Sequence, residues 1–280
     1  MQFSKALLLL AALTSGSLAD LNKRASSTLV PAPSPTSSGI PSASSSSSGG
    51  GSGGATKLRR DGGTWTDTPS DGSFSTEGFG ASTDAGGSGV SYKGNVGQPW
   101  GSNMIEVSSS DASKYKNVLQ VQGQNTETWN VVFWNKIGPD GQMTGWFGNS
   151  ALNFELSPGD TKYIAFADDS QGGFGAAPGS LPTDQSGAWA CTWGEFDFKS
   201  AGNGGWSGFD VSAIMAQKAG MTVQGMSMCD VLGGTCSSIS PDAASVDNAY
   251  TAAETAEDGI GGNINSGGAI RLTATIDYSG

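Results

Sequence analysis

The stretch that decides the fold runs from Trp193 to Ile214 and reads WGEFDFKSAGNGGWSGFDVSAI. Apolar and polar residues alternate in both halves of it, which is typical of strands that bury one face. Phe196 and Phe198 share one face of the first half, and Phe209 lies on the corresponding face of the second. The glycine-rich residues 199–208 join the halves. The stretch therefore predicts a β-hairpin whose phenylalanines point into a core.

The same alternation gathers three carboxylates on the opposite, outer face of the hairpin: Glu195, Asp197 and Asp210. Residues two apart on a strand lie about 6.6 Å apart at Cα. This spacing is compatible with both carboxylate separations used in glycoside hydrolysis, about 5–5.5 Å and about 6.5–9.5 Å. The three residues are therefore candidate catalytic groups. The alternatives are a ligand-binding cleft without catalysis and a merely solvated strand face.

Three tryptophans are candidates for contact with a sugar ring, because the indole ring is large, apolar and rigid. Trp193 lies beside the carboxylates, Trp146 begins the run Trp-Phe-Gly, and Trp206 opens the second half of the hairpin. The competing interpretation places them in the core, where most tryptophans of such a domain lie.

The chain contains no histidine. This excludes Ser-His-Asp and Cys-His nucleophilic sites and leaves acid–base chemistry to carboxylates. Three cysteines without histidine are also too few ligands for a zinc site. The segment 168–173 is expected to be a polar loop, since its spacing matches no EF-hand calcium loop. The sequence predicts neither a cofactor nor a metal site.

Short alternating runs with turn residues between them continue along the chain and predict a mainly β fold, an antiparallel β-sandwich. Strands are expected at 117–122, 128–135, 152–156, 162–167, 189–198, 209–214, 221–229 and 269–278. One short helix is expected to begin at Pro241, with Ser240 as its N-cap, and to end before Gly259.

Residues 1–19 have the pattern of a secretory signal peptide: Lys5 provides the positive charge, 6–13 are apolar, and Ala19 ends a small-residue cleavage site. The apolar run is shorter than the about 20 residues that span a bilayer. We therefore expect a secreted protein, extracellular or attached to the cell wall, without a membrane anchor.

The segment 20–60 is rich in Ser, Pro and Gly and is predicted to be a disordered propeptide or stalk. Arg24 and Arg60 each end a dibasic pair, and such pairs are candidate cleavage sites for a kexin-type protease. Little order is expected over 61–92, which is also rich in Gly and Ser. Residues 93–280 are expected to form a single domain.

Residues 61–280 contain eight Lys and Arg and 24 Asp and Glu, so their net charge is 8 − 24 = −16. This charge repels nucleic acid and anionic membranes, and neither is expected as a partner. Cys229 and Cys236 flank the sequence DVLGGT, whose glycine pair favours a local disulfide. Cys191 is then either a buried free thiol or the partner of one of the other two.

Four motifs resemble the fungal secreted allergen family named for the fourth major allergen of Aspergillus: YKGNVGQPWGSNMIEV, FWNKIGPDGQMTGWFGN, ACTWGEFDF and WSGFDVSAI. The resemblance covers about 92–278. It implies an extracellular or cell-wall-associated fungal protein that human IgE can bind, and it brings no established catalytic activity with it.

Three further motifs, FELSPGDTKYIAF, GEFDF and GFDVSAI, are similar to thaumatin-like proteins. That resemblance implies a β-sandwich with an acidic cleft, in which Glu195 and Asp210 correspond to two of the cleft acids. It also implies β-1,3-glucan as a ligand or substrate. The dense disulfides and the Asp-Cys-Gly-Gly motif of that family are missing here. We therefore expect a non-catalytic monomer that binds cell-wall β-glucan. The alternatives are a β-glucanase-like hydrolase and a secreted effector that binds a host protein.

Overall fold

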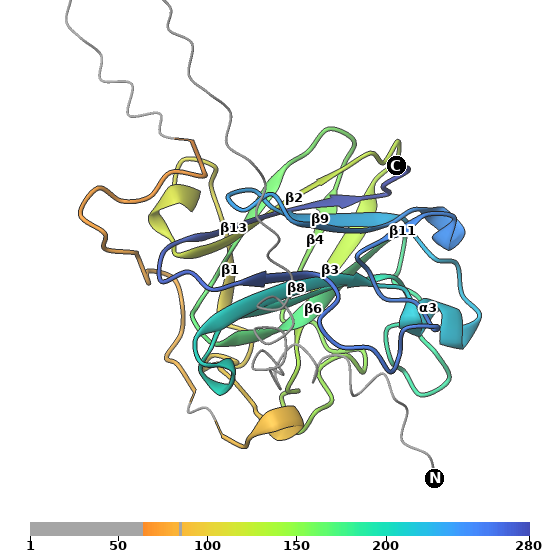
Figure 1. Cartoon of the computed structure of the whole chain (residues 1–280), viewed down its shortest axis with the longest axis horizontal. Coiled ribbons are helices and arrows are strands. Elements are labelled where there is room, and N and C mark those ends of the chain that lie inside the picture. The colour runs from red at the N-terminus through yellow and green to blue at the C-terminus, as the bar shows by residue number, and fades with distance from the viewer. Residues whose placement is uncertain (1–63, 84–85) are drawn as a thin grey trace, which may run out of the picture. The chain divides into compact units, whose positions relative to one another are not determined.

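The computed structural model describes residues 64–83 and 86–280, which form two facing β-sheets (Figure 1). One sheet has seven strands in the order β1-β5-β2-β13-β9-β10-β11, and the other has six in the order β12-β8-β7-β6-β3-β4. Figure 1 labels β2, β9 and β13 in one layer and β3, β6 and β8 in the other. The predicted mainly β sandwich is confirmed.

Most paired strands are antiparallel, but β13 runs parallel to β2 and antiparallel to β9, between which it lies. The seven-stranded sheet consists of β1 (Met104–Val107), β5 (Lys162–Phe166), β2 (Asn117–Gly123), β13 (Ile270–Ile276), β9 (Met226–Asp230), β10 (Cys236–Ile239) and β11 (Val246–Asp247). The six-stranded sheet consists of β12 (Gly262–Ile264), β8 (Trp206–Ser212), β7 (Trp193–Ser200), β6 (Ser170–Pro178), β3 (Trp129–Asn135) and β4 (Leu152–Leu156).

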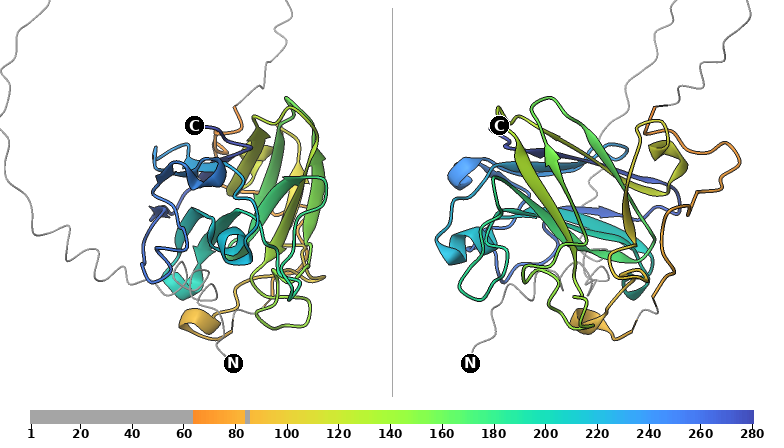
Figure 2. Two further views of the ribbon diagram at one scale, coloured as in Figure 1. Left: turned by 90° about the vertical axis from the view of Figure 1, so that its right-hand side faces the viewer. Right: turned by 180° about the vertical axis from the view of Figure 1, so that it is seen from behind.

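The helical segments are short and lie at the ends of strands. They are the α-helix α3 (Ile214–Ala219) and the 3-10 turns η2 (Gly89–Ser91), η3 (Ala112–Lys114), η4 (Ala201–Asn203) and η5 (Pro241–Ala243). In both views of Figure 2 the η2 turn and the C-terminus lie at opposite ends of the described domain.

Phenylalanine rings from both sheets fill the space between the layers. The Phe166 ring on β5 lies 4.7 Å from the Phe196 ring and 4.7 Å from the Phe198 ring, both on β7. Within the other sheet, the rings of Phe133 and Phe174 stack at 4.8 Å. These side chains are buried, as is Phe209. The prediction that the hairpin phenylalanines face the core is therefore confirmed.

The expected polar loop at 168–173 is wrong beyond Asp169, because β6 begins at Ser170 and lies between β3 and β7. Its glycines allow this central place. A Cβ at Gly172 would meet the carbonyl oxygen of Trp134, and a Cβ at Gly175 would meet the sulfur of Cys191. Glycine here marks the close approach of neighbouring chain segments rather than a loop.

The helix expected from Pro241 is also wrong. Only the 3-10 turn η5 forms, because Asp242 and Ala243 both have a φ of 56°, in the left-handed region where a helix cannot continue. The strand expected to reach Ile214 ends at Ser212, and Ile214 begins α3 instead. Gly220, with a φ of 67°, ends that helix.

The first described residues, 64–81, pack on the seven-stranded sheet and on the η3 turn beside it. The ring of Trp65 lies 5.7 Å from that of Tyr163, and the ring of Phe79 lies 5.6 Å from that of Tyr115. Arg271 on β13 donates a hydrogen bond from Nη2 to the carbonyl oxygen of Asp67 at 3.0 Å. Aromatic contacts, Arg271 and single hydrogen bonds, such as that from the Ser75 amide to the carbonyl oxygen of Lys114 at 2.8 Å, hold this segment.

Candidate functional site

The three candidate acids lie on neighbouring strands of the six-stranded sheet. Glu195 on β7 is directly opposite Asp210 on β8, and Asp197 is opposite Gly208 on β8 and Gln171 on β6. Their neighbours along the strand, the phenylalanines, face the core. The alternation of the sequence therefore predicted correctly which side chains share the outer face.

The acids are nevertheless buried, which rules out the alternative of a merely solvated strand face. The exposed fractions are 1 % for Glu195, 1 % for Asp197 and 0 % for Asp210. Burial of carboxylates is costly unless they are paired or protonated. The strand period assigns a side chain to a face, but it does not tell what packs over that face.

Glu195 and Asp210 form a hydrogen-bonded pair of carboxyl groups. Burial raises the pKa of Glu195 to about 7. Burial, and then the neighbouring Glu195, raise the pKa of Asp210 well above its usual range. As carboxylates, both offer only acceptors, and Asp210 Oδ1 and Oδ2 have no donor among the described residues. One proton held between the two groups provides the missing donor.

The contact between the two carboxyl groups does not fit the predicted catalytic spacing. A hydrogen bond between them brings their oxygens to about 2.5–3.0 Å. Glycosidases keep their two carboxyl groups at least about 5 Å apart, so that the sugar and the water or nucleophile fit between them. In this conformation Glu195 and Asp210 leave no such space.

Asp197 lies in a separate polar environment that sequence reasoning missed. Burial raises its pKa well above the usual range, Asp169 adds to this, and Lys136 opposes it. Lys136 is buried as well, which lowers its pKa to about 8. Its ammonium group donates to the carbonyl oxygen of Tyr92 at 2.9 Å and to Gln171 Oε1 at 3.5 Å. Lys136 lies two residues after the buried Trp134. The two-residue strand period could therefore have placed Lys136 on the same face of the sheet as Trp134.

Tyr250 borders the acid pair from outside the two strands. Burial raises its pKa, and the charges of Asp210 and Glu195 add to the shift. Its hydroxyl accepts a hydrogen bond from the amide of Ile260 at 3.2 Å. The residue lies in a segment with no strand pattern, so its place beside the acids could not be predicted.

The tryptophan candidates divide between core and surface. Trp193 is 4 % exposed and Trp146 is 5 % exposed, and both belong to a cluster that also contains Trp134. The rings of Trp134 and Trp193 meet edge to face at 5.1 Å. The sugar-stacking interpretation of Trp193 and Trp146 therefore does not fit, whereas Trp206 is half-buried and has part of its surface free.

An open groove lies beside this tryptophan cluster. Met215 on α3 packs against the cluster and also lines the groove, which measures about 600 Å³. Most of the other lining side chains are polar, and Ala219 and Met221 add apolar surface. The polar ones are Thr183, Asp184, Gln185, Ser186 and Lys218.

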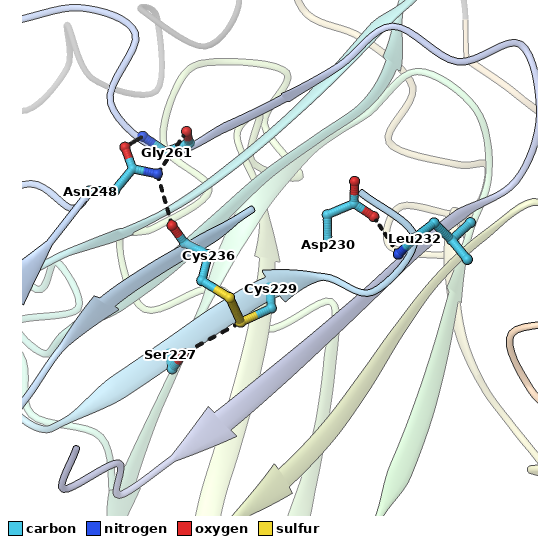
Figure 3. Close-up of a disulfide and its surroundings, with 7 residues drawn as sticks. All are labelled: Ser227, Cys229, Asp230, Leu232, Cys236, Asn248 and Gly261. Carbon is cyan, nitrogen blue, oxygen red and sulfur yellow. Dashed lines mark hydrogen bonds between the residues drawn. A yellow bond between two sulfur atoms is a disulfide. The ribbon is translucent and has the colours of Figure 1, made fainter. Parts of the chain in front are cut away.

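The disulfide joins Cys229 on β9 to Cys236 on β10, which pair directly across the hairpin (Figure 3). Gly234 in the turn between them has a φ of 79°, in the left-handed region that favours glycine. Asp230 Oδ1 accepts a hydrogen bond from the amide of Leu232 at 3.0 Å within the same turn. Cys191 is a buried free thiol, which settles the alternatives left open by the sequence.

Other expectations meet the structure only in part. Among residues 64–83 and 86–280, no group of three acidic, cysteine or histidine side chains is placed to hold a metal ion. Over the same residues, no helix is long and apolar enough to cross a membrane. The proposed processing residues Arg24 and Arg60 lie outside the described part of the chain.

The fold and the site define a β-sandwich protein with a buried pair of acids on the outer face of one sheet. The chain belongs to the family of the Allergen Asp f 4-like domain, whose model matches residues 102–276. It is 56 % identical over 215 residues to "Allergen Asp f 4" of Aspergillus fumigatus, an alignment that covers 76 % of this chain and 66 % of that protein. The chain thus spans slightly less than two thirds of that relative's length.

A solved structure, the protein elicitor MoHrip2 from Magnaporthe oryzae, is similar over 58 % of this chain and 99 % of its own. The identity is 12 % and the TM-score is 0.36. A TM-score of this size is too low to define a common fold.

Proposed function

We propose that this protein is secreted, acts outside the cell or at the cell wall as a monomer, and binds β-glucan without cleaving it. The observation that carries the proposal is that Glu195 lies directly opposite Asp210 in the β7–β8 pair, with both carboxyl groups buried and hydrogen-bonded to each other. Two acids that share a proton within a hydrogen bond lack the separation that either glycosidase mechanism requires. A raised pKa alone would suit a general acid, but the contact between the two carboxyl groups supports the non-catalytic function.

The open groove is our proposed place for the glucan. Thr183, Gln185 and Ser186 offer hydroxyl and amide groups to sugar hydroxyls, and Met215 and Met221 offer apolar surface to a ring face. The tryptophan cluster behind Met215 holds that wall in place. Binding at this groove leaves the buried acids out of contact with the ligand.

The remaining parts of the proposal rest on the sequence and the family. Secretion is supported by the signal-peptide pattern of residues 1–19. Recognition by host IgE is supported by the name of the relative, an allergen. Sequencing the N-terminus of protein collected from the culture medium tests secretion and processing, and binding of IgE from sensitised sera tests recognition.

One experiment separates binding from hydrolysis. The secreted protein is incubated with insoluble β-glucan and with laminarin, and both co-sedimentation and new reducing ends are measured. We expect co-sedimentation that Gln185→Ala and Met221→Ala weaken and Glu195→Gln leaves unchanged, with no reducing ends. Release of sugar that Glu195→Gln abolishes would establish a hydrolase, and failure to co-sediment would refute glucan binding.

A further inference from the structure

A buried lysine at the end of β7 has no partner for its charge. Lys199 is 8 % exposed, and its ammonium nitrogen has no hydrogen-bond partner among residues 64–83 and 86–280. Leaving a buried charge unpaired is costly, and native proteins rarely retain such a group without use. The domain has a strongly negative net charge and is rich in Asp and Glu. A shortage of acidic residues therefore does not explain why Lys199 has no hydrogen-bonded acid beside it.

Lys199 lies in an irregular part of strand β7. The register of β7 against β8 shifts between Asp197 and Ser200, which is the mark of a β-bulge. Lys199 has a φ of 54°, in the left-handed region that few residues other than glycine adopt. Its amide donates to Ser207 Oγ at 2.9 Å, which holds the bulge. Bulges commonly redirect a side chain, and strained residues of this kind gather at functional sites.

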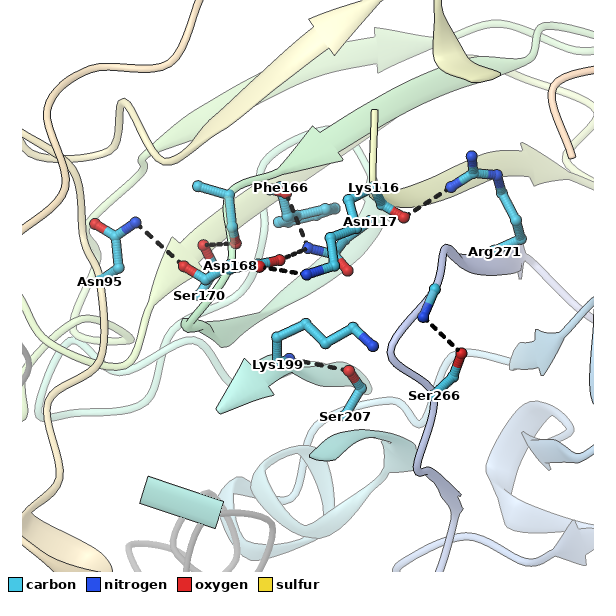
Figure 4. A network of polar contacts seen from close by, with 12 residues as sticks. Asn95, Lys116, Asn117, Phe166, Asp168, Ser170, Lys199, Ser207, Ser266 and Arg271 are labelled. Carbon is cyan, nitrogen blue, oxygen red and sulfur yellow. Dashed lines mark hydrogen bonds and ion pairs between the residues drawn. The ribbon is translucent and has the colours of Figure 1, made fainter. Parts of the chain in front are cut away.

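A second lysine, Lys116, lies at the same end of the sandwich as Lys199 (Figure 4). Burial lowers the pKa of Lys199, Lys116 lowers it further, and Asp168 raises it. Figure 4 shows the Lys199 side chain extending toward Asn117 and the loop that carries Ser266. The site thus lies between the ends of the two sheets, away from the acid pair.

Asp168, the carboxylate that favours the Lys199 charge, is already engaged. Asp168 Oδ2 binds Lys116 Nζ at 2.6 Å, and Asp168 Oδ1 accepts a hydrogen bond from Asn117 Nδ2 at 2.8 Å. Two ammonium groups against one carboxylate leave a net charge of 2 − 1 = +1. The counter-charge that Lys199 requires is therefore not supplied by its surroundings.

We propose that Lys199 and Lys116 bind a phosphate-class oxyanion at this end of the sandwich. A tetrahedral dianion presents oxygens in several directions, so one can accept from Lys199 while another accepts from Lys116 without displacing Asp168. The anion is either free phosphate or a phosphate ester on a sugar. Both share the group that the two lysines recognise. The site is separate from the proposed glucan groove and does not depend on it.

The test is titration of the full-length protein with inorganic phosphate, with glucose 6-phosphate and with acetate, followed by calorimetry and by amide NMR shifts. We expect saturable one-to-one binding of phosphate, with shifts at Lys199 and Lys116. Tighter binding of the ester would identify a sugar phosphate as the ligand, and tighter binding of inorganic phosphate would identify the free ion. Acetate binding as tight as phosphate would refute the phosphate assignment, and no binding of phosphate or its ester would refute the site.

Variants separate the site from general charge effects. Lys199→Met and Lys199→Asn should each weaken phosphate binding at least tenfold, and Lys199→Arg should retain it. Asparagine tolerates the left-handed backbone, so Lys199→Asn guards against misfolding. Lys114→Met, at an exposed lysine paired with Asp111, removes the same charge and should leave binding unchanged. Equal binding by the wild type and both Lys199 variants would overturn the proposal.

Discussion

The buried acid pair predicts that the protein becomes less stable as pH rises from 4.5 to 8. The pKa of Glu195 is raised in the folded state from 4.5 to about 7. The folded protein therefore holds a proton that the unfolded chain has released, and its stabilising effect is complete below pH 4.5 and is lost as pH passes through 7. At about 1.4 kcal/mol per pKa unit, this amounts to about 3 kcal/mol.

The assay is urea unfolding, followed by tryptophan fluorescence, at several pH values from 4.5 to 8. Burial is what raises the pKa of Glu195, so Glu195→Gln should remove the loss of about 3 kcal/mol, whereas Asp210→Asn leaves Glu195 buried and should keep it. The double variant Glu195→Gln, Asp210→Asn should lose the part of the pH slope that comes from the acid pair and keep the part that comes from Asp197, whose pKa is also raised. Glu155→Gln, at an exposed acid on β4, is the control and should behave like the wild type.

Two outcomes would refute this reasoning. The first is a wild-type free energy of unfolding that stays constant or rises between pH 4.5 and 8. The second is a double variant with the same pH slope as the wild type. Either result would mean that Glu195 and Asp210 are not held together with one proton in the folded protein.

The remaining predictions concern the disulfide and the core. Replacing Cys229 and Cys236 by Ser should lower the free energy of unfolding by about 2.5 kcal/mol, since the bond closes a short loop, and reduction of the wild type should match it in the same urea assay. Gly175→Ala should cost about 1–3 kcal/mol through the clash with the Cys191 sulfur, and Cys191→Ala should recover part of that loss in a double-mutant cycle. Phe166→Ala should cost about 3–5 kcal/mol by calorimetry, because three other phenylalanine rings pack on it.

Local alternation was sufficient to predict the sandwich and the two faces of the central hairpin. Phe196 and Glu195 are adjacent in the sequence, and the two-residue period sends them to opposite sides of β7. The same period could not tell that Glu195 is buried. Its burial depends on segments that pack over the outer face, among them the one with Tyr250.

The missed elements share a different cause. The strand β6 contains three glycines, which favour loops when taken one at a time, and only its neighbours Trp134 and Cys191 show why side chains are excluded there. Helix α3 has only six residues, too few for a helical period to stand out from the preceding strand. Both elements are determined by contacts between distant parts of the chain.

The position of β13 has a consequence for how the domain is assembled. This strand follows all the others in the chain, yet it lies between β2 and β9 and joins them. During synthesis, the two parts of the seven-stranded sheet therefore exist before the strand that connects them, and β2 and β9 each present an unpaired edge. Such edges invite pairing with other chains, and the closing contact is between residues far apart in sequence. Pairing of β13 with β2 and β9 therefore closes both of these edges at once.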